Sequence, residues 1–102
     1  VADLAYVHYL SALYLLKKKN PVIFNCGYEK GFSVLEIVKK FNLINKNKIK
    51  INFGNRRKGD VIKLVASSSK IKKVLKWKPR YNSISKILTS SLNWEKKLCK
   101  LN

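Results

Sequence analysis

A short apolar run at residues 21–26 lies between two stretches with helical periodicity. Before it, apolar residues recur at helical spacing, and Asn20–Pro21 ends this pattern. After it, Ser33 and Glu36 have the spacing of a capping box that opens a second amphipathic helix. A continuous apolar run of this length is typical of a strand buried on both faces of a parallel sheet. The order therefore predicts an α/β fold, with short parallel strands and packed helices.

The rest of the chain continues this alternation. Residues 49–53 alternate apolar and polar side chains, as a strand with one solvated face does. Residues 61–65 form another short apolar run, which could be a strand or simply extended chain. Two further helices are expected: one capped by a serine among residues 67–69, and a last one that begins near Ser83. We also expect Asp3 to cap the first helix through its first-turn amides. With 102 residues and no internal repeat, the sequence predicts one domain over residues 1–102.

Charge is the most extreme feature of the composition. The chain carries 23 Lys plus Arg against 5 Asp plus Glu, a formal net charge of +18, which would attract polyanions such as nucleic acid. However, 20 of the 23 basic residues are Lys, and Lys, Asn and Ile together fill 39 positions, as an AT-rich coding sequence would favour. The charge can therefore be explained either by a basic nucleic-acid-binding module or by a compositional bias. Of the two, we expect the bias, and we do not expect nucleic acid to be the partner.

Few residues could support catalysis or bind a metal. His8 is the only histidine, and Cys26 and Cys99 match no zinc-binding spacing, so we expect two reduced thiols in a cytoplasmic protein and no metal. No acidic pair or phosphate-binding glycine loop of the Walker type is present, and we assign no catalytic residue. The apolar-rich stretch at residues 4–16 is too short to cross a membrane.

One loop has chemical content of its own. In residues 56–60, two arginines precede a lysine, a glycine and Asp60. Guanidinium groups suit phosphate oxygens, a carboxylate suits a ribose diol, and Gly59 leaves room for the backbone. The loop is therefore a candidate nucleotide site, although a charged segment of this kind is also typical of a plain solvated loop.

In order, these segments resemble the C-terminal part of the NAD-dependent epimerase family of extended short-chain dehydrogenases/reductases. The start, with Asp3 and His8, is similar to V-x-D-L-A-x-A-H, and residues 24–37 are similar to F-N-x-G-x-x-x-G-x-S-V-x-E-I. Residues 56–60 match R-R-x-G-D, and residues 69–79 resemble S-K-x-x-x-x-L-G-W-x-P. The family pattern departs at Asn55, where proline is common, and at Lys76, which replaces glycine.

This resemblance implies the site residues and their roles. Arg57 would bind the diphosphate of a UDP-sugar, Asp60 would hydrogen-bond the uridine ribose, and Val34 would pack against the uracil ring. The chain would be the UDP-sugar-binding part of a UDP-hexose 4-epimerase, whose NAD and catalytic Tyr-x-x-x-Lys pair lie in an N-terminal Rossmann domain.

The resemblance also implies how this chain relates to a parent protein. The chain contains no glycine-rich dinucleotide motif and does not begin with Met, so we expect it to be part of a longer protein and not to bind NAD by itself. Its implied partners are a UDP-sugar, the Rossmann domain and, as a candidate assembly, a second copy in a homodimer. The alternatives are the basic nucleic-acid module and a non-catalytic remnant that only docks with other proteins.

Overall fold

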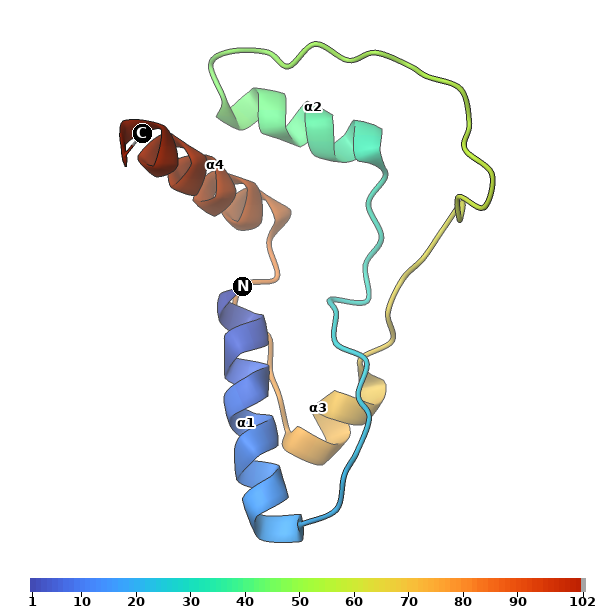
Figure 1. Ribbon diagram of the computed structural model, residues 1–102, viewed down its shortest axis with the longest axis vertical. Coiled ribbons are helices and arrows are strands. Elements are labelled where there is room, and N and C mark those ends of the chain that lie inside the picture. The colour runs from blue at the N-terminus through green and yellow to red at the C-terminus, as the bar shows by residue number, and fades with distance from the viewer. Residues whose placement is uncertain (102) are drawn as a thin grey trace. The chain divides into compact units, whose positions relative to one another are not determined.

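The computed structural model describes residues 1–101 and contains four helices in this part of the chain (Figure 1). They are α1 (Ala2–Lys18), α2 (Val34–Ile44), α3 (Ser69–Leu75) and α4 (Ile84–Leu101). Each of the four expected helices is present. Within residues 1–101 no strand is formed, so the strands expected at residues 21–26 and 49–53 are absent and the α/β class is not confirmed. Residues 61–65, where a strand and a simply extended run were both open, form no strand either.

The missing strands have a physical reason. A strand is stabilised by backbone hydrogen bonds to a neighbouring strand, because each residue otherwise leaves a donor and an acceptor unpaired. The chain divides into two compact units: unit 1 comprises Val1–Gly31 and Lys63–Asn82, and unit 2 comprises Phe32–Ile62 and the described residues from Ser83 onward. The segments at 21–26 and 49–53 belong to different units, and neither unit supplies its segment with a strand to pair with.

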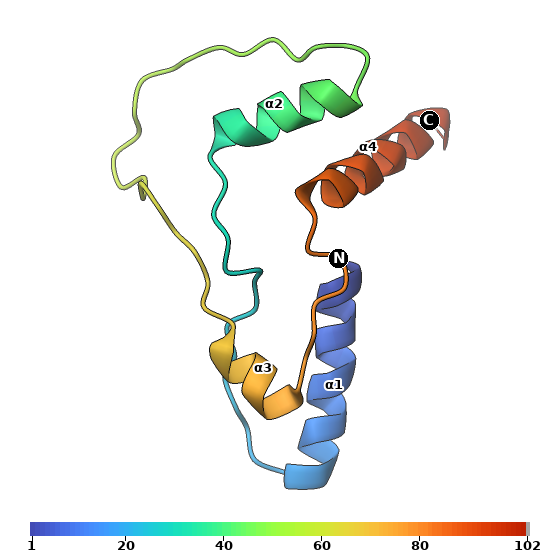
Figure 2. The same ribbon diagram turned by 180° about the vertical axis from the view of Figure 1, so that it is seen from behind.

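Unit 1 holds the small apolar core. Ile71 of α3 has no exposed surface, Trp77 is 2% exposed and Val7 of α1 is 7% exposed. Partly buried Leu10, Phe24 and Leu75 pack against these three residues. Helices α1 and α3 are in contact, and both views show α3 beside α1 (Figures 1 and 2). The core of unit 1 is therefore formed by one face of each of these two helices together with Trp77 and Phe24.

Asp3 does not cap α1. Val1 occupies the cap position without a side-chain cap, and Asp3 lies buried in the first turn. Its carboxylate accepts hydrogen bonds from the Tyr28 hydroxyl at 2.7 Å, the Arg80 N–H at 3.0 Å and the Tyr81 N–H at 2.9 Å. The expected role was wrong because these three donors, from two distant segments, bind the carboxylate in place of the first-turn amides. Asp3 thus holds three segments of unit 1 together.

A second polar cluster joins the loop after residue 26 to the start of α3. Ser68 is fully buried, and its hydroxyl accepts from the Gly27 N–H at 2.9 Å and donates to the Gly27 carbonyl. Ser68 is the residue before α3, but its side chain makes no cap, because Gly27 occupies it. The Ser68 N–H donates to Glu29 at 2.8 Å, and Lys72 donates to the other carboxylate oxygen of Glu29 at 2.9 Å.

Gly27 is required by this close approach. A Cβ atom at this position would lie 2.9 Å from Cβ of Ala66, which is shorter than side-chain carbon atoms tolerate. The glycine in this loop therefore serves backbone packing within unit 1.

Helix α2 starts as the sequence predicts. The Ser33 hydroxyl accepts from the Glu36 N–H at 3.2 Å, and the Glu36 carboxylate accepts from the Ser33 N–H at 3.0 Å, which confirms the capping box. In unit 2, α2 packs against α4. Neither helix has a fully buried residue, so unit 2 presents partly covered helix faces and lacks a closed core.

Candidate functional site

The loop at residues 55–60 lies in the irregular segment that follows α2 in unit 2 (Figure 1). Nε of Arg57 lies 3.3 Å from Oδ2 of Asp60, and the two side chains form an ion pair. The Asp60 N–H also donates weakly, at 3.5 Å, to the Arg57 carbonyl. Gly59 has a φ of +83°, a conformation that side chains with a Cβ adopt only with strain. This glycine therefore allows the turn that brings Arg57 and Asp60 together.

The pair is accessible to a ligand. The Arg57 side chain is 86% exposed and that of Asp60 is 48% exposed. An exposed ion pair of this kind contributes only about 0–1 kcal/mol to stability. The pair engages Nε of the guanidinium and Oδ2 of the carboxylate. The terminal amino groups of Arg57 and Oδ1 of Asp60 are then the atoms available for a bound molecule.

Val34 lies in another part of unit 2. It is the first residue of α2, directly after the Ser33 cap, and it is 77% exposed. The capping box fixes the backbone at this position, so the apolar side chain is presented to solvent at a helix start. The structure thus brings two of the three expected site residues into contact, and it places the third in the first turn of α2.

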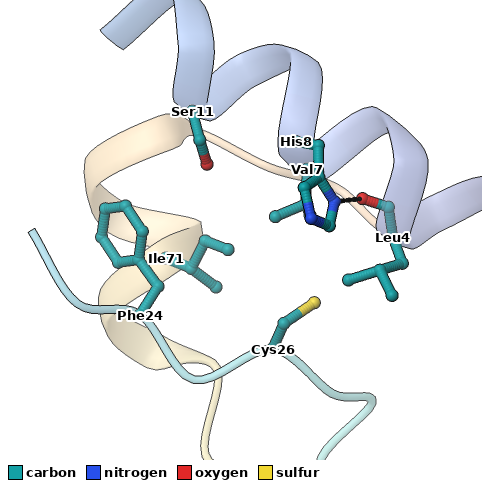
Figure 3. Close-up of a pocket in the computed structure, with 7 residues that line it drawn as sticks. All are labelled: Leu4, Val7, His8, Ser11, Phe24, Cys26 and Ile71. Atoms are coloured by element: carbon teal, nitrogen blue, oxygen red, sulfur yellow. Dashed lines mark hydrogen bonds between the residues drawn. The ribbon is translucent and has the colours of Figure 1, made fainter. Parts of the chain in front are cut away.

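Unit 1 contains a pocket of about 240 Å³ that reasoning from the sequence missed (Figure 3). It is lined by residues of α1, of the extended segment after α1 and of α3: Leu4, Val7, His8, Ser11, Phe24, Cys26 and Ile71. The separation of His8 and Cys26 in the sequence gives no sign that they line one pocket. Partial desolvation, and then the negative charge of Asp3, raise the pKa of the Cys26 thiol.

The described residues form neither a strand–turn–helix unit for a dinucleotide nor a cluster of metal-ligating side chains. In the Rossmann fold, NAD is held by a strand, a glycine-rich turn and a helix N-terminus, and residues 1–101 contain no strand to begin such a unit. In the same part of the chain, no three His, Cys, Asp or Glu side chains gather where they could hold a metal. Both cysteines are free thiols there. Among residues 1–101, no helix combines the length and the apolar character needed to cross a membrane.

Comparison with known proteins finds relatives that are named as UDP-sugar 4-epimerases. No family model matches the chain. The chain is 36% identical over 98 residues to a UDP-glucose 4-epimerase of Azospirillum brasilense and 40% identical over 94 residues to one of Lacticaseibacillus casei. These matches cover 96% and 92% of the chain. A UDP-arabinose 4-epimerase of Arabidopsis thaliana is 33% identical over 96 residues, or 94% of the chain.

The matches cover only part of each relative. The chain spans 28% of the length of the two bacterial enzymes and 23% of the plant enzyme. This share is consistent with the C-terminal part that the order of the motifs indicates. Over nearly its whole length, the chain is therefore a relative of one part of the UDP-glucose 4-epimerases.

Proposed function

We propose that residues 1–102 form the C-terminal, UDP-sugar-binding part of a UDP-glucose 4-epimerase. The observation that carries this proposal is the contact between Arg57 and Asp60, which the Gly59 turn holds in an accessible loop. The similarity to UDP-glucose 4-epimerases along 92–96% of the chain supports it. The parent protein would interconvert UDP-glucose and UDP-galactose, with NAD held by an N-terminal Rossmann domain that this chain does not include.

Arg57 would bind the diphosphate. Its planar guanidinium can donate two parallel hydrogen bonds from its terminal amino groups to phosphate oxygens, and such charge-assisted bonds are stronger than neutral ones. Nε already donates to Asp60, which favours one orientation of the guanidinium plane. The ion pair thus prepares Arg57 for the phosphate with part of its freedom already removed.

Asp60 and Val34 would recognise the uridine. Oδ1 of Asp60 can accept from a ribose hydroxyl while Oδ2 remains on Arg57. The exposed Val34 side chain offers an apolar surface to the face of the uracil ring. Burial of that side chain under the ring would remove apolar area from water and favour binding.

None of these contacts selects the sugar. Arg57, Asp60 and Val34 are assigned to the nucleotide, and the relatives include both UDP-glucose and UDP-arabinose 4-epimerases. UDP is therefore the suitable probe, because it contains every group that these three residues would contact.

The test is calorimetric titration of the chain with UDP. Arg57→Ala and Asp60→Ala are each expected to weaken binding by about tenfold or more, because each removes a charge-assisted hydrogen bond of about 1.5–3 kcal/mol. Val34→Ala is expected to weaken binding severalfold through lost apolar contact. Arg56→Ala is the matched control: it removes the same charge from the neighbouring position and should leave most of the affinity.

Two results would contradict the proposal. If UDP does not bind at millimolar concentration, the part does not bind the nucleotide by itself. If Arg56→Ala and Arg57→Ala weaken UDP equally, the affinity arises from net positive charge and the assignment of Arg57 is wrong. Repeating the titration at higher salt separates these cases further, because an unspecific charge effect declines with screening.

A further inference from the structure

The pocket in unit 1 is a site of different chemistry from the Arg57–Asp60 loop. Its lining residues all belong to unit 1, whereas Val34, Arg57 and Asp60 all belong to unit 2. Figure 3 shows α1 along one side, α3 on another and the segment with Phe24 and Cys26 on a third. The candidate nucleotide residues therefore do not explain this pocket.

The floor of the pocket is apolar and largely built from the core of unit 1. Val7 and Ile71 are 7% and 0% exposed, so their positions are fixed by packing, and Phe24 is half-buried against them. The Phe24 ring also meets Tyr14 edge to face, with centroids 6.4 Å apart. An apolar cavity of about 150 Å³ is enough to bind benzene. At about 240 Å³, this pocket has room for a ring of one or two cycles.

The His8 side chain offers a hydrogen-bond acceptor on the wall of the pocket. Nδ1 of His8 lies 2.8 Å from the carbonyl oxygen of Leu4, one helical turn earlier. A carbonyl oxygen can only accept, so Nδ1 must carry the hydrogen in this contact. In the neutral imidazole, Nε2 is then a bare acceptor, and this nitrogen faces the cavity in Figure 3.

We propose that this pocket binds a small aromatic molecule that carries an N–H or O–H donor, such as an indole or a phenol. The ring lies on Val7, Phe24 and Ile71, and its donor bonds to Nε2 of His8. The Ser11 hydroxyl lies on the same wall, one turn of α1 further along, and is available to the polar edge of the ring.

The lining residues favour an aromatic ligand with a hydrogen-bond donor over a purely aliphatic ligand and over an anion. A purely aliphatic ligand would remove water from Nε2 of His8 without replacing its hydrogen bond, which costs free energy. An anion would find no basic side chain among the lining residues, apart from His8 itself. Lys70, whose ammonium lies over the Phe24 ring, is not one of the lining residues, and it donates to the Ile23 carbonyl at 3.0 Å.

The test compares indole with 1-methylindole, which keeps the ring and lacks the N–H donor. Binding is followed by NMR titration of the whole chain. Indole is expected to bind about threefold to tenfold more tightly, because a net hydrogen bond contributes about 0.5–1.5 kcal/mol. In His8→Phe this difference should disappear, whereas Tyr9→Phe, at the neighbouring position outside the lining, should retain it.

The two free thiols give an independent readout of the location. Cys26 lines the pocket, while Cys99 lies on α4 in unit 2, so it serves as an internal control. Saturating indole is expected to slow alkylation of Cys26 by iodoacetamide and to leave the rate at Cys99 unchanged, with both measured by peptide mass spectrometry. Protection of both thiols or of neither would overturn the site. Equal affinity of the unmodified chain for indole and 1-methylindole would overturn the hydrogen bond to His8, whether or not the His8 variant folds.

Discussion

The hydroxyl of Tyr28 donates a 2.7 Å hydrogen bond to the carboxylate of Asp3, across 25 positions of the chain. The same carboxylate accepts the backbone N–H groups of Arg80 and Tyr81. Burial by itself raises the pKa of Asp3, but the hydrogen bonds from Tyr28, Arg80 and Tyr81 outweigh it and hold the pKa below its ordinary value. The charged form of Asp3 is therefore the form that unit 1 is built around.

Replacing Asp3 by alanine should destabilise the chain strongly. Two backbone N–H groups and one hydroxyl, all in partly buried hydrogen bonds, would lose a charged acceptor, and we expect a loss of about 3 kcal/mol in the free energy of unfolding. Urea denaturation followed by circular dichroism measures this loss. Tyr28→Phe removes only one of the three donors and should cost about 1 kcal/mol. Equal effects of the two substitutions would show that the backbone donors contribute nothing.

Alkaline pH should weaken the same cluster. Burial, together with the hydrogen bond to Asp3 and the charges of Asp3 and Cys26, raises the pKa of Tyr28 from 10.0 to about 12. The folded chain therefore holds the Tyr28 proton more tightly than the unfolded chain does. The protonated hydroxyl of Tyr28 contributes its full share of stability below pH 10, and this share is lost as the pH rises towards 12. Free energies of unfolding at several pH values in this range should fall more steeply for the unmodified chain than for Tyr28→Phe. Parallel curves would contradict the shift.

Alanine at two glycines should have opposite effects. In Gly27→Ala the new methyl would lie 2.9 Å from Cβ of Ala66. We expect a loss of about 1–3 kcal/mol from overpacking. Gly54→Ala is the control, since nothing lies within 4 Å of its Cβ position, and reduced freedom of the unfolded chain should stabilise it by up to about 1 kcal/mol. Thermal unfolding of both variants measures the difference, and a stable Gly27→Ala would show that the loop can move away from Ala66.

Lys76 follows α3 in a left-handed conformation, with φ 51° and ψ 34°. Glycine adopts this conformation without the Cβ penalty, so Lys76→Gly should raise the free energy of unfolding by about 1 kcal/mol. The same substitution at Lys73, an exposed position inside α3, should lower it by about 1 kcal/mol. Chemical denaturation of the pair tests the sign, and a loss of stability in Lys76→Gly would refute the strain at this position.

The helices could be predicted from the sequence because their signals are local. The capping box at Ser33 and Glu36 and the stop at Asn20–Pro21 act within one turn, and the structure shows the corresponding helix ends. The similarity at Lys76 was also informative: the family places glycine there, and the structure shows the left-handed backbone that favours glycine. Strands depend on a partner elsewhere, and the extended segments at 21–26 and 49–53 have none in their own units.

For the candidate sites, too, only the contacts between residues close in the sequence could be predicted. Arg57 and Asp60 are three positions apart, so a turn at Gly59 is enough to bring them together. The pocket in unit 1 could not be foreseen, because its residues come from α1, the segment after it and α3. For Asp3 the chemical preference for N–H donors was correct, but the donors lie in residues 80 and 81 rather than in its own helix.

The division into two units bears on the order in which the chain can fold during synthesis. Each unit is assembled from two separate stretches, and the chain passes from one unit to the other after Gly31, after Ile62 and after Asn82. Domains made of one continuous stretch can fold one after another as they leave the ribosome. Here α1 must wait for α3, and α2 must wait for α4, so neither unit is complete until most of the polypeptide has been made. A truncation from either end therefore interrupts a unit, and a single cut cannot release either one intact.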